Sequence, residues 1–238
     1  MKLAIIGYGK MGKAIESLAM AAGHEIVLRI DEDNADTLTE QNLKKADVSV
    51  EFTRPETAIE HLLLCFRCGV PVVSGTTGWL DDLPNVLKER QRQQGGFFYA
   101  SNFSIGVNIT FAVNRMLARL MQDQPNYDIA MEEIHHTQKL DAPSGTAITL
   151  AEDIVREIER KTTWVNKSEH EPGEIPIVSQ RIEGIPGTHE IRYSSEVDTI
   201  TLRHEAHSRA GFARGALKAA EWMVGKRGYF GMSDLLGF

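Results

Sequence analysis

The sequence predicts an α/β protein of two domains: a Rossmann-type domain with a parallel sheet, and an α+β domain with an open mixed sheet. Strand-like and helix-like segments alternate over residues 1–104, which is the pattern of a parallel sheet with right-handed crossovers. After this region the pattern changes to long amphipathic helices and a group of strand-like segments. We therefore expect a first domain at 1–104, completed by the C-terminal segment 213–238, and a second domain at 105–212.

A glycine-rich turn follows the first expected strand. The apolar run at 3–6 leads into GYGKMG at 7–12, and a helical pattern comes next. In such a motif Gly7 permits the tight turn, Gly9 lets the backbone approach a pyrophosphate, and Gly12 lets the helix pack closely on the strand. Because a strand precedes the motif and a helix follows it, the segment predicts a dinucleotide-binding turn.

The second expected strand, 24–30, ends at an acidic residue. Asp31 lies 19 residues after Gly12, close to the spacing at which a carboxylate hydrogen-bonds the adenosine ribose. A carboxylate there favours NADH, because it would repel the 2′-phosphate of NADPH. No arginine follows Asp31 directly, although Arg29 lies near in the sequence. The alternative is that Asp31 only closes a turn.

The rest of the first domain continues the alternation after a short polar helix or loop at 34–46. The expected elements are a strand at 47–53, a helix at 56–68, a strand at 70–74, a helix at 80–94 and a strand at 96–100. Ligands of such sheets bind beyond the carboxyl ends of the strands. Small, polar or glycine-rich segments fall at those ends: Gly7–Gly12, Asp31, Thr53-Arg54, Gly75–Gly78 and Ala100–Phe103.

The second domain combines helices with a sheet. The expected elements are a helix at 107–121, a strand at 128–134, a helix at 144–160, strands at 175–182, 189–195 and 199–205, and a returning helix at 212–224. The polar region 162–174 carries no expected element. Short breaks between the last three strands predict antiparallel hairpins or a meander. An open sheet of this kind needs a cover or a partner at its edge.

The segment HHTQKLDAPSGTA at 135–147 concentrates reactive groups just before a helix. It holds two imidazoles, an ammonium group and a carboxylate, followed by a Pro-Ser-Gly-Thr turn. Free backbone N–H groups and the dipole at a helix start can hold an anion. Taken singly, His135 and His136 could be ordinary strand residues and Lys139 a solvated cation. Together they predict a site that binds a carboxylate and protonates a group beside it.

Composition and charge exclude several classes of protein. Of 238 residues, 25 % are charged and 42 % hydrophobic, and the net charge is −7. Without a basic tail or block, a nucleic-acid partner is not expected. No apolar run approaches the roughly 20 residues of a membrane span, and a strand-like run stands where a signal peptide would begin. We expect no membrane partner and a cytoplasmic location.

Cys65 and Cys68 are the two cysteines of the chain. Redox Cys-x-x-Cys pairs normally begin a helix, where the dipole lowers the thiol pKa. Here the pair closes a helix-like stretch before Gly69, and no second pair exists to complete a zinc site. We expect structural cysteines.

The chain resembles the 4-hydroxy-tetrahydrodipicolinate reductase (dihydrodipicolinate reductase) family over nearly its whole length. The motifs that carry the resemblance are GYGKMG at 7–12, EFTRPE at 51–56, SGTTG at 74–78, SNFSIGVN at 101–108, HHTQKLDAPSGTA at 135–147 and HSRAGFARGA at 207–216. The resemblance implies NAD(P)H-dependent reduction of a cyclic imine with two carboxylates in the diaminopimelate route of lysine biosynthesis. It also implies a homotetramer assembled through the sheet of the second domain.

The resemblance implies a role for each matching position. The implied cofactor-binding residues are Gly7, Tyr8, Gly9, Lys10, Met11, Gly12, Asp31, Gly75, Thr76, Thr77, Ala100, Ser101, Asn102 and Phe103. Substrate binding falls to His136, Gly145 and Thr146, and acid/base chemistry to His135 and Lys139, without a metal. The chain departs from the family in being short between Asp31 and Asp47 and in lacking a basic residue directly after the acid. We expect NADH to be preferred, with NADPH as the alternative.

Three other functions are compatible with parts of the sequence. A metal-dependent hydrolase would use the histidines with an acid, but His204-Glu205-Ala206-His207 does not have the spacing of the zinc helix motif. A nucleotide sensor would have no need of the cluster around Lys139. A different reductase of the same plan, such as an amino-acid dehydrogenase, is the third. NADH consumption separates a reductase from a sensor, and a chelator identifies a metalloenzyme.

Overall fold

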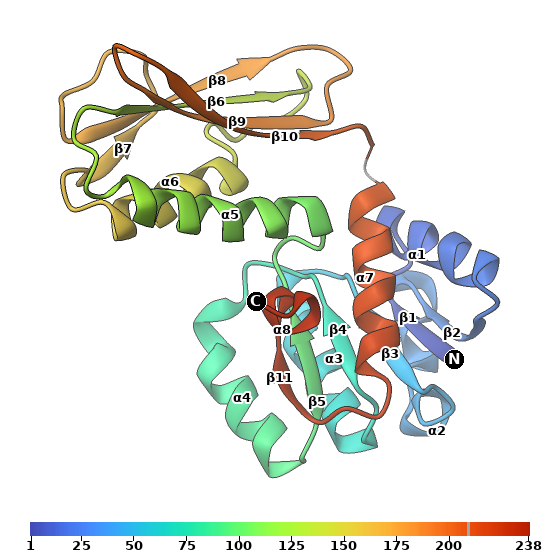
Figure 1. The fold of residues 1–238 in the computed structure, drawn as a ribbon. Helices are drawn as coiled ribbons and strands as arrows, with labels where there is room; N and C mark the ends of the chain where they lie inside the picture. The colour runs from blue at the N-terminus through green and yellow to red at the C-terminus, as the bar shows by residue number, and fades with distance from the viewer. Residues whose placement is uncertain (209) are drawn as a thin grey trace. The chain divides into compact units, whose positions relative to one another are not determined.

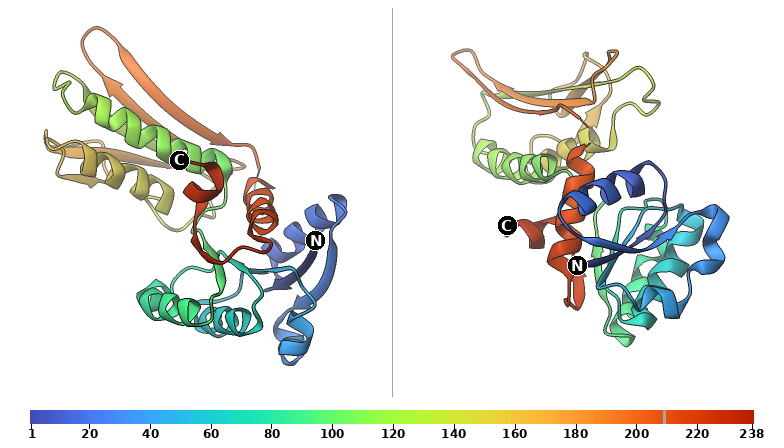
Figure 2. Two further views of the ribbon diagram at one scale, coloured as in Figure 1. Left: turned by 60° about the horizontal axis from the view of Figure 1, so that its bottom comes forward. Right: turned by 90° about the vertical axis from the view of Figure 1, so that its right-hand side faces the viewer.

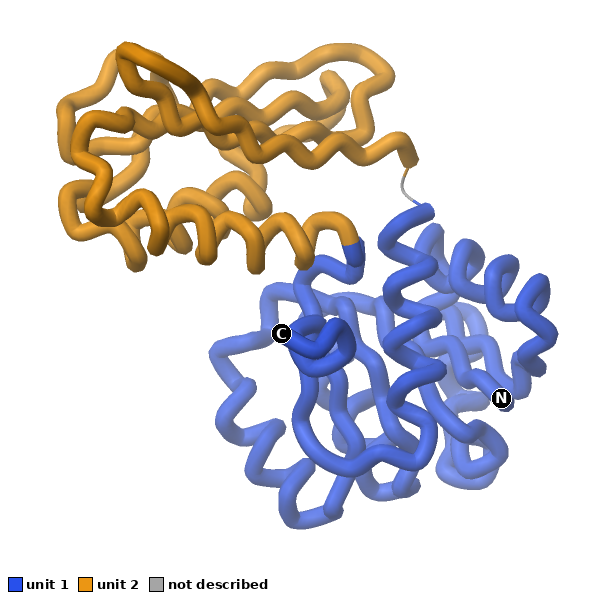
Figure 3. The backbone as a smooth tube through the Cα atoms, viewed as in Figure 1, with its two compact units in different colours: residues 1–105, 210–238 blue, residues 106–209 orange. Residues whose placement is uncertain are grey.

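The structure is a computed structural model that describes residues 1–208 and 210–238. These fall into two compact units (Figures 1 and 3). Unit 1 comprises residues 1–105 and 210–238, and unit 2 comprises residues 106–209. Among the described helices, none is both long and apolar enough to cross a membrane.

Unit 1 is built on a six-stranded parallel sheet with the order β11-β5-β4-β3-β1-β2. Its strands are β1 (Lys2–Ile6), β2 (Glu25–Ile30), β3 (Val48–Glu51), β4 (Val72–Ser74), β5 (Gly96–Tyr99) and β11 (Gly228–Phe230). The predicted parallel sheet is confirmed. The strand β11 was not predicted, because three residues are too few to show a period.

Helices cover both faces of this sheet (Figures 1 and 2). They are α1 (Lys10–Ala21), α2 (Glu40–Leu43), α3 (Pro55–Cys68), α4 (Leu83–Arg92), α7 (Ala210–Met223) and α8 (Met232–Leu236), with 3-10 helices η1 (Glu32–Thr37) and η2 (Leu80–Asp82). Successive strand residues face opposite ways. Leu3 and Ile5 therefore pack toward α1 and α7, while Ala4 and Ile6 pack toward α3 and α4.

The two cysteines lie at the end of α3, which closes at Gly69 in the left-handed conformation. Both thiols are free. Cys65 is fully buried, and burial raises the pKa of its thiol to about 12. A thiol held in its neutral form is a packing group, as expected for a structural cysteine.

Unit 2 contains a five-stranded mixed sheet with the order β10-β9-β6-β8-β7. Its strands are β6 (Asp128–His135), β7 (Thr163–Val165), β8 (Glu174–Arg181), β9 (Gly187–Ser194) and β10 (Thr199–Ala206). The helices α5 (Ile105–Met121) and α6 (Gly145–Glu157) cover one face (Figure 2). The predicted open mixed sheet is confirmed.

The pairing within this sheet corrects the hairpin prediction. β9 and β10 form the expected antiparallel pair, but β8 does not pair with β9. Instead β6 lies between them, parallel to β8 and antiparallel to β9. The buried side chains Ile129 and Met131 make β6 the central strand, and a central strand needs a neighbour on each side. Short breaks in the sequence could not reveal this preference.

Two further details of unit 2 differ from the predictions. The strand β7 lies in the polar region 162–174, where no element was expected. The helix expected to reach Arg160 ends at Glu157, because Ile158 adopts an extended conformation. The side chain of Ile158 is fully buried, so leaving the helix directs an apolar group into the core.

Candidate functional site

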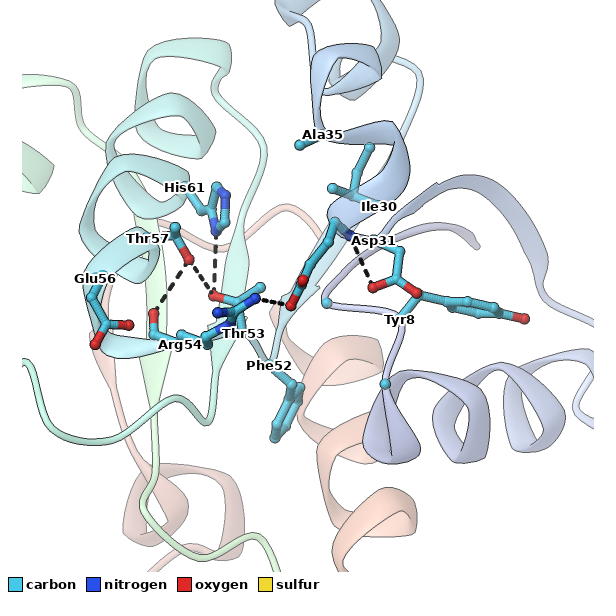
Figure 4. Close-up of a pocket in the computed structure, with 13 residues that line it drawn as sticks. Tyr8, Ile30, Asp31, Ala35, Phe52, Thr53, Arg54, Glu56, Thr57 and His61 are labelled. Atoms are coloured by element: carbon cyan, nitrogen blue, oxygen red, sulfur yellow. Dashed lines mark hydrogen bonds and ion pairs between the residues drawn. The ribbon is translucent and has the colours of Figure 1, made fainter.

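A cavity of about 470 Å³ lies in unit 1 at the carboxyl ends of β1, β2 and β3 (Figure 4). Its walls combine the glycine-rich turn, the start of η1 and the segment that leads into α3. The lining residues are Gly7, Tyr8, Gly9, Ile30, Asp31, Glu32, Ala35, Phe52, Thr53, Arg54, Glu56, Thr57 and His61. Ligands of parallel sheets bind at this edge.

Each glycine of the turn occupies its position for a different structural reason. Gly7 has φ +96°, and a Cβ there would lie 2.1 Å from the carbonyl oxygen of Phe52. A Cβ on Gly12 would lie 2.3 Å from the carbonyl oxygen of Gly7, so α1 packs against the turn only with glycine there. Gly9 caps α1 and has no described atom within 4 Å of an added Cβ. An open helix start of this kind fits the pyrophosphate of a dinucleotide.

Asp31 lies at the end of β2 and caps η1. Its carboxylate accepts a hydrogen bond from the backbone N–H of Glu32 at 2.9 Å. Glu32 pairs with Arg54, and the Arg29 side chain donates to Glu16 at 2.6 Å. Both basic residues near Asp31 therefore already have carboxylate partners. The sequence placed Arg54 at a strand end where ligands bind, but its position beside Asp31 was not predicted, because Arg54 lies after β3 rather than in the segment after Asp31.

A buried carboxylate joins two segments at the same sheet edge. We call Glu51, Thr53, Ser74 and Thr76 the Glu51 cluster. One oxygen of Glu51 accepts from the Thr76 hydroxyl at 2.7 Å and from the N–H of Thr53 at 3.0 Å. The other accepts from the Ser74 hydroxyl at 2.6 Å. The cluster holds the loop after β3, which lines the cavity, against the loop after β4.

The remaining predicted cofactor residues fall into buried and exposed groups. The side chains of Thr76, Ala100 and Phe103 are buried, so contact with a dinucleotide there would be made by backbone atoms. Met11 packs on the core. The exposed residues are Lys10, Thr77 and Ser101, while Gly75 and Asn102 are half-buried. Among the described residues that line the cavity, sequence reasoning did not predict Ile30, Glu32, Ala35, Phe52, Glu56, Thr57 and His61. The polar strand end at Thr53-Arg54 was the signal in the sequence for this wall of the cavity.

The carboxyl end of β6 in unit 2 carries a polar network on the face that α6 covers. We call Glu133, His135, Arg181 and His189 the Glu133 cluster. Glu133 lies opposite His189 on β9, and His135 lies opposite Arg181 on β8. His135 Nδ1 is 2.6 Å from Glu133 Oε2, and Arg181 donates to Glu133 Oε1 at 3.0 Å.

Burial and hydrogen bonding oppose each other at Glu133. Burial raises the pKa of its carboxyl group, but hydrogen bonds from His135, Ser144, Arg181 and Ser179 outweigh burial and hold the pKa well below its usual range. Burial and the nearby His135 also lower the pKa of His189, to about 3. For a histidine, a lowered pKa favours the neutral form. Glu133 is therefore ionised and His189 neutral near pH 7.

Lys139 and the start of α6 lie in the segment that follows β6. The Lys139 ammonium group donates to Asp141 at 2.7 and 2.8 Å. Ser144 caps α6: its hydroxyl accepts from the N–H of Ala147 at 3.2 Å and contacts His189 Nε2 at 3.1 Å. Gly145 is exposed, and an added Cβ would meet no described atom within 4 Å. His136 and Thr146 are half-buried.

Glu133, His135 and His189 also bring one donor atom each within 4.8 Å of one another. This set differs from the histidine and acid set that the metal-hydrolase alternative would use. The guanidinium group of Arg181 already supplies a positive charge to Glu133. The geometry therefore favours a proton-carrying network at this position.

Comparison with known proteins identifies the family. The family models described as “Dihydrodipicolinate reductase, N-terminus” and “Dihydrodipicolinate reductase, C-terminus” match residues 1–103 and 106–236. A 4-hydroxy-tetrahydrodipicolinate reductase of Christiangramia forsetii is 44 % identical, with 99 % of this chain and 98 % of that protein covered. The chain belongs to the dihydrodipicolinate reductase family. The resemblance read from the motifs is confirmed.

Other members and structures agree with this assignment. A 4-hydroxy-tetrahydrodipicolinate reductase of Neisseria meningitidis is 34 % identical over 93 % of this chain and 84 % of its own length. The solved structure of a dipicolinate-bound dihydrodipicolinate reductase from Paenisporosarcina sp. TG-14 matches with a TM-score of 0.78 and 27 % identity, covering 98 % of each chain. An amine dehydrogenase of Mycobacterium smegmatis shares the fold at a TM-score of 0.60 and 12 % identity, covering 95 % of this chain and 93 % of its own. The family is one of nicotinamide-dependent reductases of lysine biosynthesis.

Proposed function

We propose that this protein is a 4-hydroxy-tetrahydrodipicolinate reductase that uses NADH or NADPH. Its product would be tetrahydrodipicolinate in the diaminopimelate route of lysine biosynthesis. One observation carries the proposal: the family's motif at 135–147 forms a hydrogen-bonded acid/base cluster beside the open start of α6. Sequence identity of 44 % over nearly the whole chain supports it.

Unit 1 supplies the dinucleotide site in this proposal. The turn at Gly7–Gly12 and the start of α1 would hold the pyrophosphate, and Asp31 would hydrogen-bond the adenosine ribose. The bound dinucleotide supplies a hydride to the substrate. Asp31, with Glu32 beside it, adds negative charge where NADPH would place its 2′-phosphate. Because Arg54 and Arg29 already pair with carboxylates, we propose that NADH is preferred.

The substrate is a cyclic imine with two carboxylates, and unit 2 carries the groups that would bind it. The N–H groups at Gly145 and Thr146 would hold one carboxylate at the start of α6. His136 would contact the other. The solved dipicolinate-bound relative supports a dicarboxylate ligand in this family.

His135 and Lys139 would provide the proton. When the hydride adds to one end of the conjugated C=C–C=N system, negative charge develops on the ring atoms and an acid must neutralise it. The Lys139 ammonium group stabilises that charge, and the His135 imidazolium donates a proton to the ring. One hydride and one proton are added to this conjugated form; when the hydroxylated substrate is supplied, its 4-hydroxyl group leaves as water to give that form before the hydride adds. Lys139 pairs with the exposed Asp141, so a substrate carboxylate can replace that partner.

The test is a reductase assay with NADH and freshly formed substrate, followed at the nicotinamide absorbance. The expected result is consumption of NADH that depends on the substrate and resists a chelator. Lys139→Ala should lower kcat by roughly 10²-fold, as for loss of a group that stabilises the charge developing in the transition state, with the Kd for NADH retained. Unchanged turnover in this variant would remove Lys139 from the mechanism. The ratio of kcat/KM for NADH and NADPH in the same assay measures the cofactor preference.

We also propose a homotetramer assembled through the sheet of unit 2. The sheet is open, with β10 and β7 at its edges, and open edges are usually covered or paired. Val178 on β8 is an exposed apolar side chain of this sheet. Light scattering of the purified protein measures the assembly, and a monomeric mass would contradict it. A cytoplasmic location stays a prediction.

A further inference from the structure

We infer that Glu133 is the positioning residue of this active site: one buried carboxylate fixes which nitrogen of His135 faces the substrate and, through Arg181, holds the backbone that carries Lys139. The inference rests on the proposed function, in which His135 and Lys139 form the acid/base pair. Glu133 itself would not touch the substrate.

The position of Glu133 follows from the alternation of β6. Ile129 and Met131 point into the core, and Glu133 and His135 continue on the same face toward the end of the strand. Glu133 is 0 % exposed. An ionised carboxylate at such a depth is strongly unfavourable unless it is paired and hydrogen-bonded. A charge on the core face of the strand, beside a histidine, therefore indicates a role beyond packing.

The contact between Glu133 and His135 determines the tautomer of the ring. Nδ1 lies 2.6 Å from Glu133 Oε2, an ion-pair distance, and a proton on Nδ1 is favoured there because an ionised carboxylate repels the lone pair of an unprotonated nitrogen. The other nitrogen, Nε2, lies over Gly187, where an added Cβ would be only 3.0 Å away. Glycine at 187 therefore leaves space beside the nitrogen that remains available for proton exchange.

This arrangement suits a proton donor. In the imidazolium form, Nδ1–H is held by Glu133 and Nε2–H is offered to the substrate. After Nε2 gives its proton to the reduced ring, a neutral imidazole protonated at Nδ1 remains, still bonded to Glu133. A proton from solvent then restores the imidazolium. A carboxylate that orients a histidine and stabilises its charged form without being protonated itself is the arrangement known from catalytic triads.

Arg181 extends the influence of Glu133 to the loop of Lys139. Its guanidinium group donates to Glu133 at 3.0 Å, to the carbonyl oxygen of Asp141 at 2.6 Å and to that of Lys139 at 3.3 Å. The guanidinium group carries five N–H donors in a fixed plane, which suits it to hold several acceptors at once in a defined geometry. The backbone on both sides of the Lys139–Asp141 pair is thus fixed to the buried carboxylate.

The experiment compares Glu133→Gln with Glu133→Asp and with the control Glu132→Gln. Glu132 is the neighbour on the opposite face of β6, where it bonds Gln180. We expect Glu133→Gln to lower kcat about 100-fold with little change in KM and in the Kd for NADH. Glu133→Asp keeps the charge and should recover about tenfold of this loss, and Glu132→Gln should keep the normal kcat. A purely structural role would lower the amount of folded enzyme rather than kcat per folded molecule.

The tautomer is also measurable in the unaltered protein, which makes the test independent of how the variants fold. The ¹⁵N shifts of His135, assigned by loss of its signals in His135→Gln, should show a protonated Nδ1 in the neutral ring. A neutral ring protonated at Nε2, or a normal kcat in Glu133→Gln, overturns the inference. If instead His135→Gln keeps a normal kcat, the proposed acid/base function fails, whatever Glu133 does.

Discussion

The two units each contain a fully buried glutamate near the end of a central strand, Glu51 on β3 and Glu133 on β6. Their partners differ in charge. The described donors to Glu51 are hydroxyl groups and a backbone N–H, whereas Glu133 faces the guanidinium group of Arg181 and the ring of His135. The same side chain is therefore stabilised by hydroxyl and N–H groups in one unit and by a guanidinium group beside an imidazole ring in the other.

This difference matches what each cluster can do. The described donors to Glu51 are hydroxyl and backbone N–H groups with strict geometry, so the Glu51 cluster can align two loops at the edge of the cavity. An imidazole ring can take up and release a proton while a guanidinium group keeps its charge, so the Glu133 cluster can serve proton transfer. A buried carboxylate at a strand end is thus not a single kind of feature; its partners decide its role.

The largest expected effect comes from removing one partner from each cluster. Arg181→Met leaves Glu133 buried and without its guanidinium partner, and we expect the free energy of unfolding to fall by about 3 kcal/mol. Thr76→Val removes one neutral donor from Glu51 and should lower it by about 1 kcal/mol. Urea denaturation measures both. Equal losses would show that the charge of the partner does not distinguish the clusters.

The second effect is on the pH dependence of stability. His189 has a folded pKa of about 3 against an ordinary value of 6.5, so below pH 6.5 the unfolded chain binds a proton that the folded protein does not. Stability is fully present above pH 6.5 and falls with decreasing pH, at up to roughly 1.4 kcal/mol per pH unit. Below pH 4.5 the lowered pKa of Glu133 adds a loss in the same direction.

Substitution separates the contributions of the two units to this slope. His189→Gln should remove most of the slope between pH 6 and pH 4. His61 in unit 1 is less buried, and burial lowers its pKa less, so His61→Gln should remove a smaller part. Urea midpoints measured at several pH values test this order. A larger loss of the pH slope in His61→Gln than in His189→Gln would contradict the comparison.

The last effect is on cofactor binding and is expected from Glu51→Gln. The amide replaces an acceptor oxygen with N–H groups, and the backbone N–H of Thr53 cannot turn away from them as a hydroxyl could. We expect the loops after β3 and β4 to loosen and the Kd for NADH to rise about tenfold, or about 1.4 kcal/mol. Calorimetric titration measures this value. Glu60→Gln, an exposed change on α3, is the control, and an equal Kd in the two variants would remove Glu51 from cofactor binding.

Local pattern was sufficient for much of the fold. The alternation over residues 1–104 predicted the parallel sheet, and the spacing of Gly7, Gly9 and Gly12 predicted a turn whose close contacts the structure shows. The string at 135–147 indicated both the family and the start of α6 at Ser144. These features depend on residues close together in the chain, so the sequence displays them directly.

The partners of the buried groups could not be predicted from local sequence patterns. Glu133 and His135 are two residues apart on one strand, and this spacing was available as a signal, but Arg181 lies 46 residues after His135 on another strand. Arg54 reaches the region of Asp31 from the segment after β3, and Glu51 meets Thr76 in the loop after β4. No period in the sequence relates these positions.

The sequence by itself determined most of the longer helices and strands of this protein, the glycine turn and the chemical identity of the cluster after β6. Only the tertiary structure decided that β6 separates β8 from β9, and therefore which side chains surround Glu133. The physical reason is that strand order depends on the apolar surface buried across the whole sheet. The strand order decides which charged side chains become neighbours in the interior. These pairs can therefore be identified only in the folded structure.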